Sequence, residues 1–163
     1  MHTRSHTTKK KSLSLKIGYR QPIEAFKPNG LWYSLDDEWT EWCWGNMPAW
    51  VKKHSHYLDI DQSKMLVIET LVDLQKFEDR FSVNPMISEF TSLNWEKVSL
   101  SYSGIEIRNY HQLKYQIFSL DYKRLWMYGW DVNGGCVWDL SAINSVRVSD
   151  TPTLAQIHLM EID

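Results

Sequence analysis

The sequence predicts a single α+β domain, with a split antiparallel or mixed β-sheet as its core and helices flanking it. The chain has 163 residues, of which 43% are hydrophobic and 23% charged, and this is typical of one globular domain. Its predicted strands are short and outnumber its predicted helices. Two helices separate the early strands from the later ones, which favours α+β over a doubly wound parallel sheet.

The charge pattern divides the chain into a basic, flexible tail over residues 1–11 and one domain over residues 12–163. Residues 1–23 hold six lysine or arginine residues and no acid, whereas the remainder holds 12 basic and 20 acidic residues. Such an arm is either a solvated tail or a contact for nucleic acid. No apolar run approaches about 18 residues, and the N-terminus lacks the apolar segment of a signal peptide. We therefore expect a cytoplasmic protein with no membrane partner.

The first predicted elements are two strands and a helix. Residues 12–19 alternate polar and apolar side chains with period two, which predicts a strand. Residues 30–35 follow a Pro-Asn-Gly turn and form a second short strand. Asp36 or Asp37 can cap a helix that ends near Gly45.

The middle of the chain carries clearer signals. Residues 54–60 and 64–69 are expected to be strands. Thr70 and Asp73 have the spacing of a capping box, and Asn94 can cap a further helix. The apolar stripe of the helix after Thr70 comprises Leu71, Leu74, Phe77 and Phe81.

In the last third, residues 104–107 are expected to form a strand, and residues 109–124 are ambiguous, with a mobile loop as one interpretation. Residues 126–130 and 135–140 are expected to be strands around an Asn-Gly-Gly turn, and residues 145–149 a last core strand.

Nine tryptophans fall mainly into two groups, within residues 32–50 and 126–138. They indicate a large aromatic core, a wall that stacks on a planar ligand, or both. Cys43 and Cys136 are expected to be free, buried thiols, because two isolated cysteines make a poor disulfide framework. His54 and His56 share a strand face without an obvious third ligand, so we expect no metal.

One arrangement of motifs points to a family. A predicted strand ends in Tyr19-Arg20, a Gly30-Leu31-Trp32-Tyr33-Ser34 strand follows it, and Asp131 precedes the 135–140 strand. Across residues 12–148, this order resembles the ADP-ribosyltransferase superfamily, and small phage-encoded and toxin-like members most closely. In that superfamily a first-strand residue holds NAD, the second strand lines the nicotinamide pocket, and a late acid does the chemistry. Here Tyr19 or Arg20 stands in place of the usual first-strand histidine.

The resemblance implies an NAD-dependent mono-ADP-ribosyltransferase, a phage or bacterial effector or toxin, that uses NAD as its substrate and modifies a protein or nucleic acid. Asp131 is the first choice of catalytic acid and Glu106 the second, because a carboxylate stabilises the cation-like ribose as nicotinamide leaves. The residues expected to bind NAD are Tyr19, Arg20, Trp32, Tyr33, Ser34 and Trp130. Of the two rings that point to opposite strand faces, Trp32 and Tyr33, we expect Tyr33 to face the nicotinamide.

Other interpretations stay open. Asp131 can be a turn residue, and Glu106 an exposed position on an alternating strand. The chain can instead be a noncatalytic module that binds nucleic acid or nucleotides through its basic arm and stacking tryptophans. A third possibility is a glycosidase or nuclease with paired acids. Its acids would come from Asp36, Asp37, Glu38 and Glu41.

Overall fold

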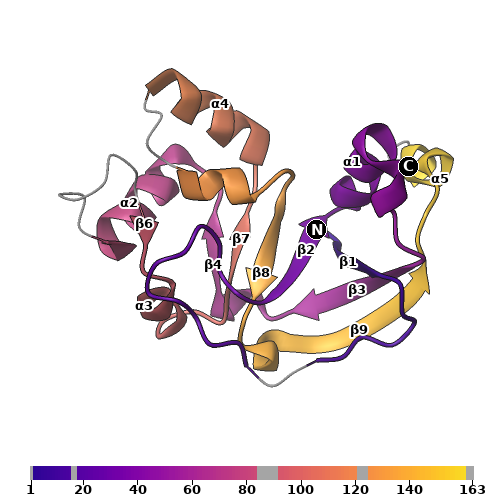
Figure 1. Ribbon diagram of the computed structural model, residues 1–163, viewed down its shortest axis with the longest axis horizontal. Coiled ribbons are helices and arrows are strands. Elements are labelled where there is room, and N and C mark those ends of the chain that lie inside the picture. The colour runs from indigo at the N-terminus through magenta and orange to yellow at the C-terminus, as the bar shows by residue number, and fades with distance from the viewer. Residues whose placement is uncertain (1, 16–17, 84–91, 121–124, 161–163) are drawn as a thin grey trace.

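The computed structural model describes residues 2–15, 18–83, 92–120 and 125–160, and within them it has an α+β fold built on a mixed sheet (Figure 1). In sheet order the strands are β4 (Met65–Ile68), β7 (Gly104–Ile107), β8 (Gly134–Val137), β2 (Leu31–Leu35), β1 (Arg4–Thr8), β3 (His54–Ile60) and β9 (Ile143–Asp150). The β4–β7 pair is parallel, and every other pair of neighbours in this sheet is antiparallel. A small second sheet pairs β5 (Ser82–Val83) with β6 (Ser92–Leu93).

The large sheet splits between β2 and β1. These strands pair only at Arg4–Leu35 and Ser5–Ser34, whereas β1 pairs with β3 over four residues. Beyond Ser34 the backbones of β1 and β2 are no longer paired. There the His6 side chain bonds β2 instead, with its Nδ1 2.6 Å from the carbonyl oxygen of Trp32. Figure 1 shows the consequence: β7 and β8 run across the direction of β3 and β9.

The first strand differs from the prediction. Residues 4–8, expected within a flexible tail, form β1 in the middle of the sheet, and the strand expected at 12–19 is wrong over its described residues, 12–15 and 18–19. Period-two alternation missed β1 because the strand is polar throughout. Its Arg4 side chain is buried, and the Nε atom of that side chain donates to Oε2 of Glu106 at 2.6 Å. β1 is therefore attached to the centre of the sheet through a buried ion pair, whereas most central strands pack through apolar side chains.

The helices cover the sheet in two groups (Figure 1). One group lies beside β4 and β7 and comprises α2 (Leu71–Phe81), α3 (Trp95–Ser99) and α4 (Tyr110–Leu120). The other lies near the opposite end and comprises α1 (Glu38–Asn46) and α5 (Leu154–Met160). The predicted capping box of α2 is confirmed, with Asp73 N donating to Thr70 and Thr70 N donating to the Asp73 carboxylate.

Two late predictions need correction, and one ambiguous segment takes a definite form. Residues 110–120 of that segment form α4, and residues 121–124 lie outside the described part of the chain. Residues 125–129 form a 3₁₀ helix rather than a strand. The 145–149 strand exists as part of β9, but it is an exposed edge strand instead of a core strand.

Tryptophan rings explain why residues 126–130 leave the sheet. Trp126 contacts Trp95 and Trp130 edge-on, with centroid distances of 6.1 and 5.8 Å, and Trp95 contacts Trp138 at 6.4 Å. Such aromatic pairs contribute about 0.5–1.5 kcal/mol each beyond simple burial. The aromatic core that the sequence indicates is therefore packed on one face of the β4–β7–β8 part of the sheet.

The opposite face of the sheet carries a smaller aliphatic cluster that includes Leu31, Tyr33, Leu35 and Leu58. Both cysteines are buried and free, as expected. Among the described residues, no helix combines the length and the apolar character needed to cross a bilayer.

Candidate functional site

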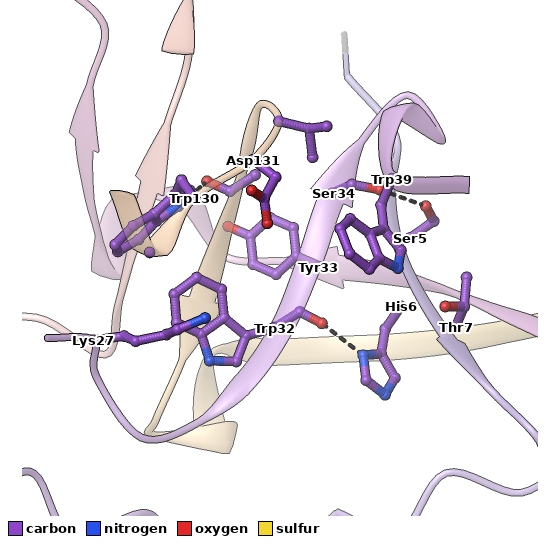
Figure 2. A pocket seen from close by; sticks show the side chains of 13 residues that line it. Ser5, His6, Thr7, Lys27, Trp32, Tyr33, Ser34, Trp39, Trp130 and Asp131 are labelled. Atoms are coloured by element: carbon purple, nitrogen blue, oxygen red, sulfur yellow. Dashed lines mark hydrogen bonds between the residues drawn. The ribbon is translucent and has the colours of Figure 1, made fainter. Parts of the chain in front are cut away.

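A cavity of about 280 Å³ lies at the split in the sheet (Figure 2). Segments far apart in the sequence line it: β1, β2, the start of α1, and the chain that enters β8. The lining residues are Ser5, His6, Thr7, Lys27, Trp32, Tyr33, Ser34, Trp39, Gly129, Trp130, Asp131, Val132 and Gly134. Five of the predicted site residues thus meet in one cavity, namely Trp32, Tyr33, Ser34, Trp130 and Asp131.

Tryptophan rings form the walls. Trp32 and Trp130 meet edge to face at 4.7 Å, and Trp130 is fixed because its Nε1 donates to the carbonyl oxygen of Gly134 at 3.2 Å. Trp39 stands on the other side of the cavity (Figure 2). Nζ of Lys27 lies 5.3 Å from the centre of the Trp32 ring, so a cation sits at the rim. Planar walls with one cation at the edge suit a flat, partly anionic ligand.

The carboxylate of Asp131 points toward the space between Trp130 and Trp39 (Figure 2). Asp131 is exposed. The Asp131 charge also acts on a buried residue: burial and the Asp131 carboxylate together raise the pKa of the Tyr110 hydroxyl. A ligand in the cavity would therefore meet a negative charge next to aromatic walls.

The floor at the split is polar. Oγ of Ser5 and Oγ of Ser34 lie 3.2 Å apart and share a hydrogen bond. Burial and the nearby His56 lower the pKa of His6, although its bond to the Trp32 carbonyl acts in the opposite direction. The imidazole of His6 is thus neutral near pH 7. Because only an N–H can donate to a carbonyl, Nδ1 carries the proton and Nε2 is left as an acceptor.

Glu106, the second-choice acid, does not line this cavity. Its side chain is fully buried, and it accepts hydrogen bonds from Arg4 at 2.6 and 3.1 Å, from Tyr33 at 2.8 Å and from Arg108 at 2.8 Å. Burial alone would raise the pKa of Glu106, but these bonds and the Arg4 charge hold it below its ordinary value. Glu106 is thus a buried anion in β7 whose hydrogen bonds to Arg4 and Tyr33 link β7 to β1 and β2.

Tyr33 and Trp32 both line the cavity, but their rings have different surroundings. The Tyr33 ring belongs to the aliphatic cluster on one side of the sheet, and its hydroxyl ends on Glu106. The Trp32 ring packs on the other side, against Trp130. Both residues line the cavity, and their rings pack in different clusters on either side of β2.

Tyr19 and Arg20 lie in an adjoining hollow that shares Lys27 and Trp32 with the main cavity. The loop that carries them is well braced. Nε2 of Gln21 donates to the carbonyl oxygens of Tyr19 and Asn29 at 3.1 and 2.6 Å. This second hollow extends the main cavity past the Trp32 ring, toward the Arg20 side chain.

Sequence reasoning missed Ser5, His6, Thr7, Lys27 and Trp39. The three β1 residues were missed together with the strand itself, because they were assigned to a tail. The alternative acids of the α1 region are all engaged elsewhere: Asp36 with His2, Asp37 with Tyr57, Glu38 with Asn133 and Glu41 with His158. Within the described residues, no three side chains of metal-ligating type come together.

The comparisons with known proteins give no family assignment. No protein-family model, no curated protein and no solved structure matches the chain. The function is therefore inferred from the site itself.

Proposed function

We propose that the protein is an NAD-dependent mono-ADP-ribosyltransferase. One observation carries the proposal: the first strand, the second strand and the acid before β8 converge on one cavity at the split in the sheet. The resemblance to the superfamily names the second strand and the acid, but it placed the first-strand motif at Tyr19-Arg20, which is not a strand and lies in the adjoining hollow. We assign the role of the first-strand histidine to His6 of β1 instead, because His6 lines the cavity.

The residues around the cavity suit the parts of NAD. The nicotinamide ring is flat, so it would lie against Trp32 and Trp130. The pyrophosphate would run along the adjoining hollow, past Lys27 and Arg20, since guanidinium and ammonium groups bind phosphate oxygens. Nε2 of His6, which has no hydrogen-bond partner among the residues that the structure describes, would accept a hydrogen bond from a ribose hydroxyl.

Asp131 would act on the ribose. When the bond between the ribose anomeric carbon and the nicotinamide nitrogen breaks, nicotinamide leaves as a neutral molecule with the bonding electrons. The sugar becomes cation-like, and a carboxylate beside it stabilises this charge more than it stabilises bound NAD. The acceptor then bonds to the anomeric carbon and releases a proton. The products are nicotinamide, the ADP-ribosylated acceptor and that proton.

Calorimetric titration with NAD tests the assignment of the cavity. The wild-type protein should bind NAD, and Trp32→Ala should weaken binding roughly 5- to 100-fold, the usual cost of losing one stacking ring. Trp44→Ala is the matched control, because Trp44 lies outside both hollows and donates to the Pro152 carbonyl. If millimolar NAD produces neither heat nor a higher melting temperature, the proposal is wrong.

A further inference from the structure

Exposed lysines gather at one end of the β1–β3 pair. Three follow β1 directly, and two immediately precede β3. The antiparallel register places Thr8 opposite His54, so the two runs lie side by side. We call them the lysine cluster: Lys9, Lys10, Lys11, Lys52 and Lys53.

The lysine cluster has little acid near it. Its side chains are exposed, with Lys52 half-buried, and among the described residues none of them forms an ion pair. Asp150 stands opposite His54, where its carboxylate lies 3.2 Å from His54 Nδ1. The cluster is therefore a positive patch on a protein whose net charge is −2.

A surface of tryptophan rings lies between this patch and the cavity. Trp39 and Trp42 stack on one face of α1, with centroids 5.1 Å apart and planes 9° apart. Trp50 packs against both, at 6.2 and 6.5 Å, and is 46% exposed. Trp39 also lines the cavity, and Trp50 precedes Lys52 by two residues, so the rings connect the two places.

A second connection runs along β1. Thr7 lines the cavity, and Lys9 begins the lysine cluster two residues later. The acids of α1 have partners of their own: Glu38 binds Asn133 and Glu41 binds His158. We call the cavity, the three tryptophan rings and the lysine cluster the strip, because β1 and α1 link them.

We propose that this strip binds single-stranded nucleic acid and that the strand is the acceptor of ADP-ribose. Its unpaired bases would stack on Trp50 and its neighbours, its phosphates would contact the lysine cluster, and one base would reach the cavity. A duplex fits poorly, because its bases already stack on one another. The proposal rests on the proposed function for its chemical step. A base nitrogen bonds to the ribose anomeric carbon, nicotinamide leaves with the electron pair of the broken bond, and that nitrogen loses a proton to solvent.

The test measures fluorescence anisotropy of a labelled 12-nucleotide strand, as DNA and as RNA, and of the corresponding duplexes, all without NAD. Single strands should bind at least tenfold more tightly than duplexes. Trp50→Ala should weaken strand binding roughly 5- to 100-fold, whereas Tyr115→Ala, which removes an exposed ring on α4, should not. A plot of log affinity against log salt concentration gives a slope that reports the number of neutralised phosphates. Lys10→Glu should make this slope shallower by about 0.7 for each phosphate that the protein no longer neutralises. Lys76→Glu on α2 is the control and should leave the slope unchanged.

Several results would overturn the proposal: equal affinity for strand and duplex, a Trp50→Ala effect no larger than that of Tyr115→Ala, or retention on anionic lipid vesicles in place of oligonucleotide. The two proposals fail separately because the strand assay contains no NAD. Turnover of NAD without strand binding refutes the acceptor and leaves the transferase. Strand binding without NAD binding refutes the transferase and makes the strip the surface of a noncatalytic module.

Discussion

Replacing Glu106 with alanine should destabilise the protein more than any surface change. The substitution removes a fully buried carboxylate that accepts bonds from Arg4, Tyr33 and Arg108. Arg4 is itself only 7% exposed, so its charge would stay buried without its anionic partner. Breaking a buried ion pair in this way costs about 3–5 kcal/mol. For a chain of this length, that loss should lower the melting temperature by roughly 6–20 °C.

The assay is urea unfolding at pH 7, followed by tryptophan fluorescence. Glu69→Ala is the matched control, because Glu69 pairs with the same Arg108 at 3.6 Å but is half exposed, and such a pair contributes only about 0–1 kcal/mol. The double variant Arg4→Met with Glu106→Leu should lose less stability than Glu106→Ala, since no isolated charge remains. The reasoning is refuted if Glu106→Ala costs no more than Glu69→Ala.

Two further predictions concern the same sheet. Gly135→Ala should lower the free energy of unfolding by about 1–3 kcal/mol, because the new Cβ would lie 2.2 Å from the Ile105 carbonyl oxygen and 2.5 Å from the Tyr33 hydroxyl. Gly45→Ala is the control for the urea titration: its Cβ would meet open space, so the change should be neutral or stabilising. The lowered pKa of His6 predicts that the protein loses stability on acidification. As the pH falls below about 6.5, His6 is protonated in the unfolded chain but stays neutral in the folded chain. The loss ends once the pH falls below the pKa of His6 in the folded chain. His6→Gln should flatten this part of the profile of melting temperature against pH, and an unchanged slope would contradict the assignment.

Local signals predicted the parts of the fold that depend on local physics. The α2 capping box of Thr70 and Asp73, the Asn94 cap of α3 and the strand at residues 54–60 all form where the sequence indicates. In each case the predictive pattern lies within a few consecutive residues, and both caps bond a residue three positions further on.

The predictions failed where distant partners decide the structure. β1 is stabilised by the contact between Arg4 and Glu106, which lie 102 positions apart, and no short window contains that information. The residues after 125 look like a strand, but Trp126 and Trp130 are drawn into an aromatic core around Trp95. β9 was expected in the core, but it lies at the edge of the sheet and is mostly exposed, because no further strand pairs with it within the described chain.

The candidate site follows the same division. Trp32, Tyr33, Ser34, Trp130 and Asp131 were identified from their own short motifs, and the fold brings them together. His6 was missed because its strand was missed.

Release of nicotinamide from NAD tests the central claim most directly. The wild-type protein, supplied with a single-stranded oligonucleotide or with water alone as acceptor, should release nicotinamide. Asp131→Asn should bind NAD but release nicotinamide at least about 100-fold more slowly, the usual cost of losing one group that stabilises transition-state charge. Asp139→Asn, outside the cavity, is the control. Release that Asp131→Asn leaves intact, or no NAD binding by the wild-type protein, would contradict the account.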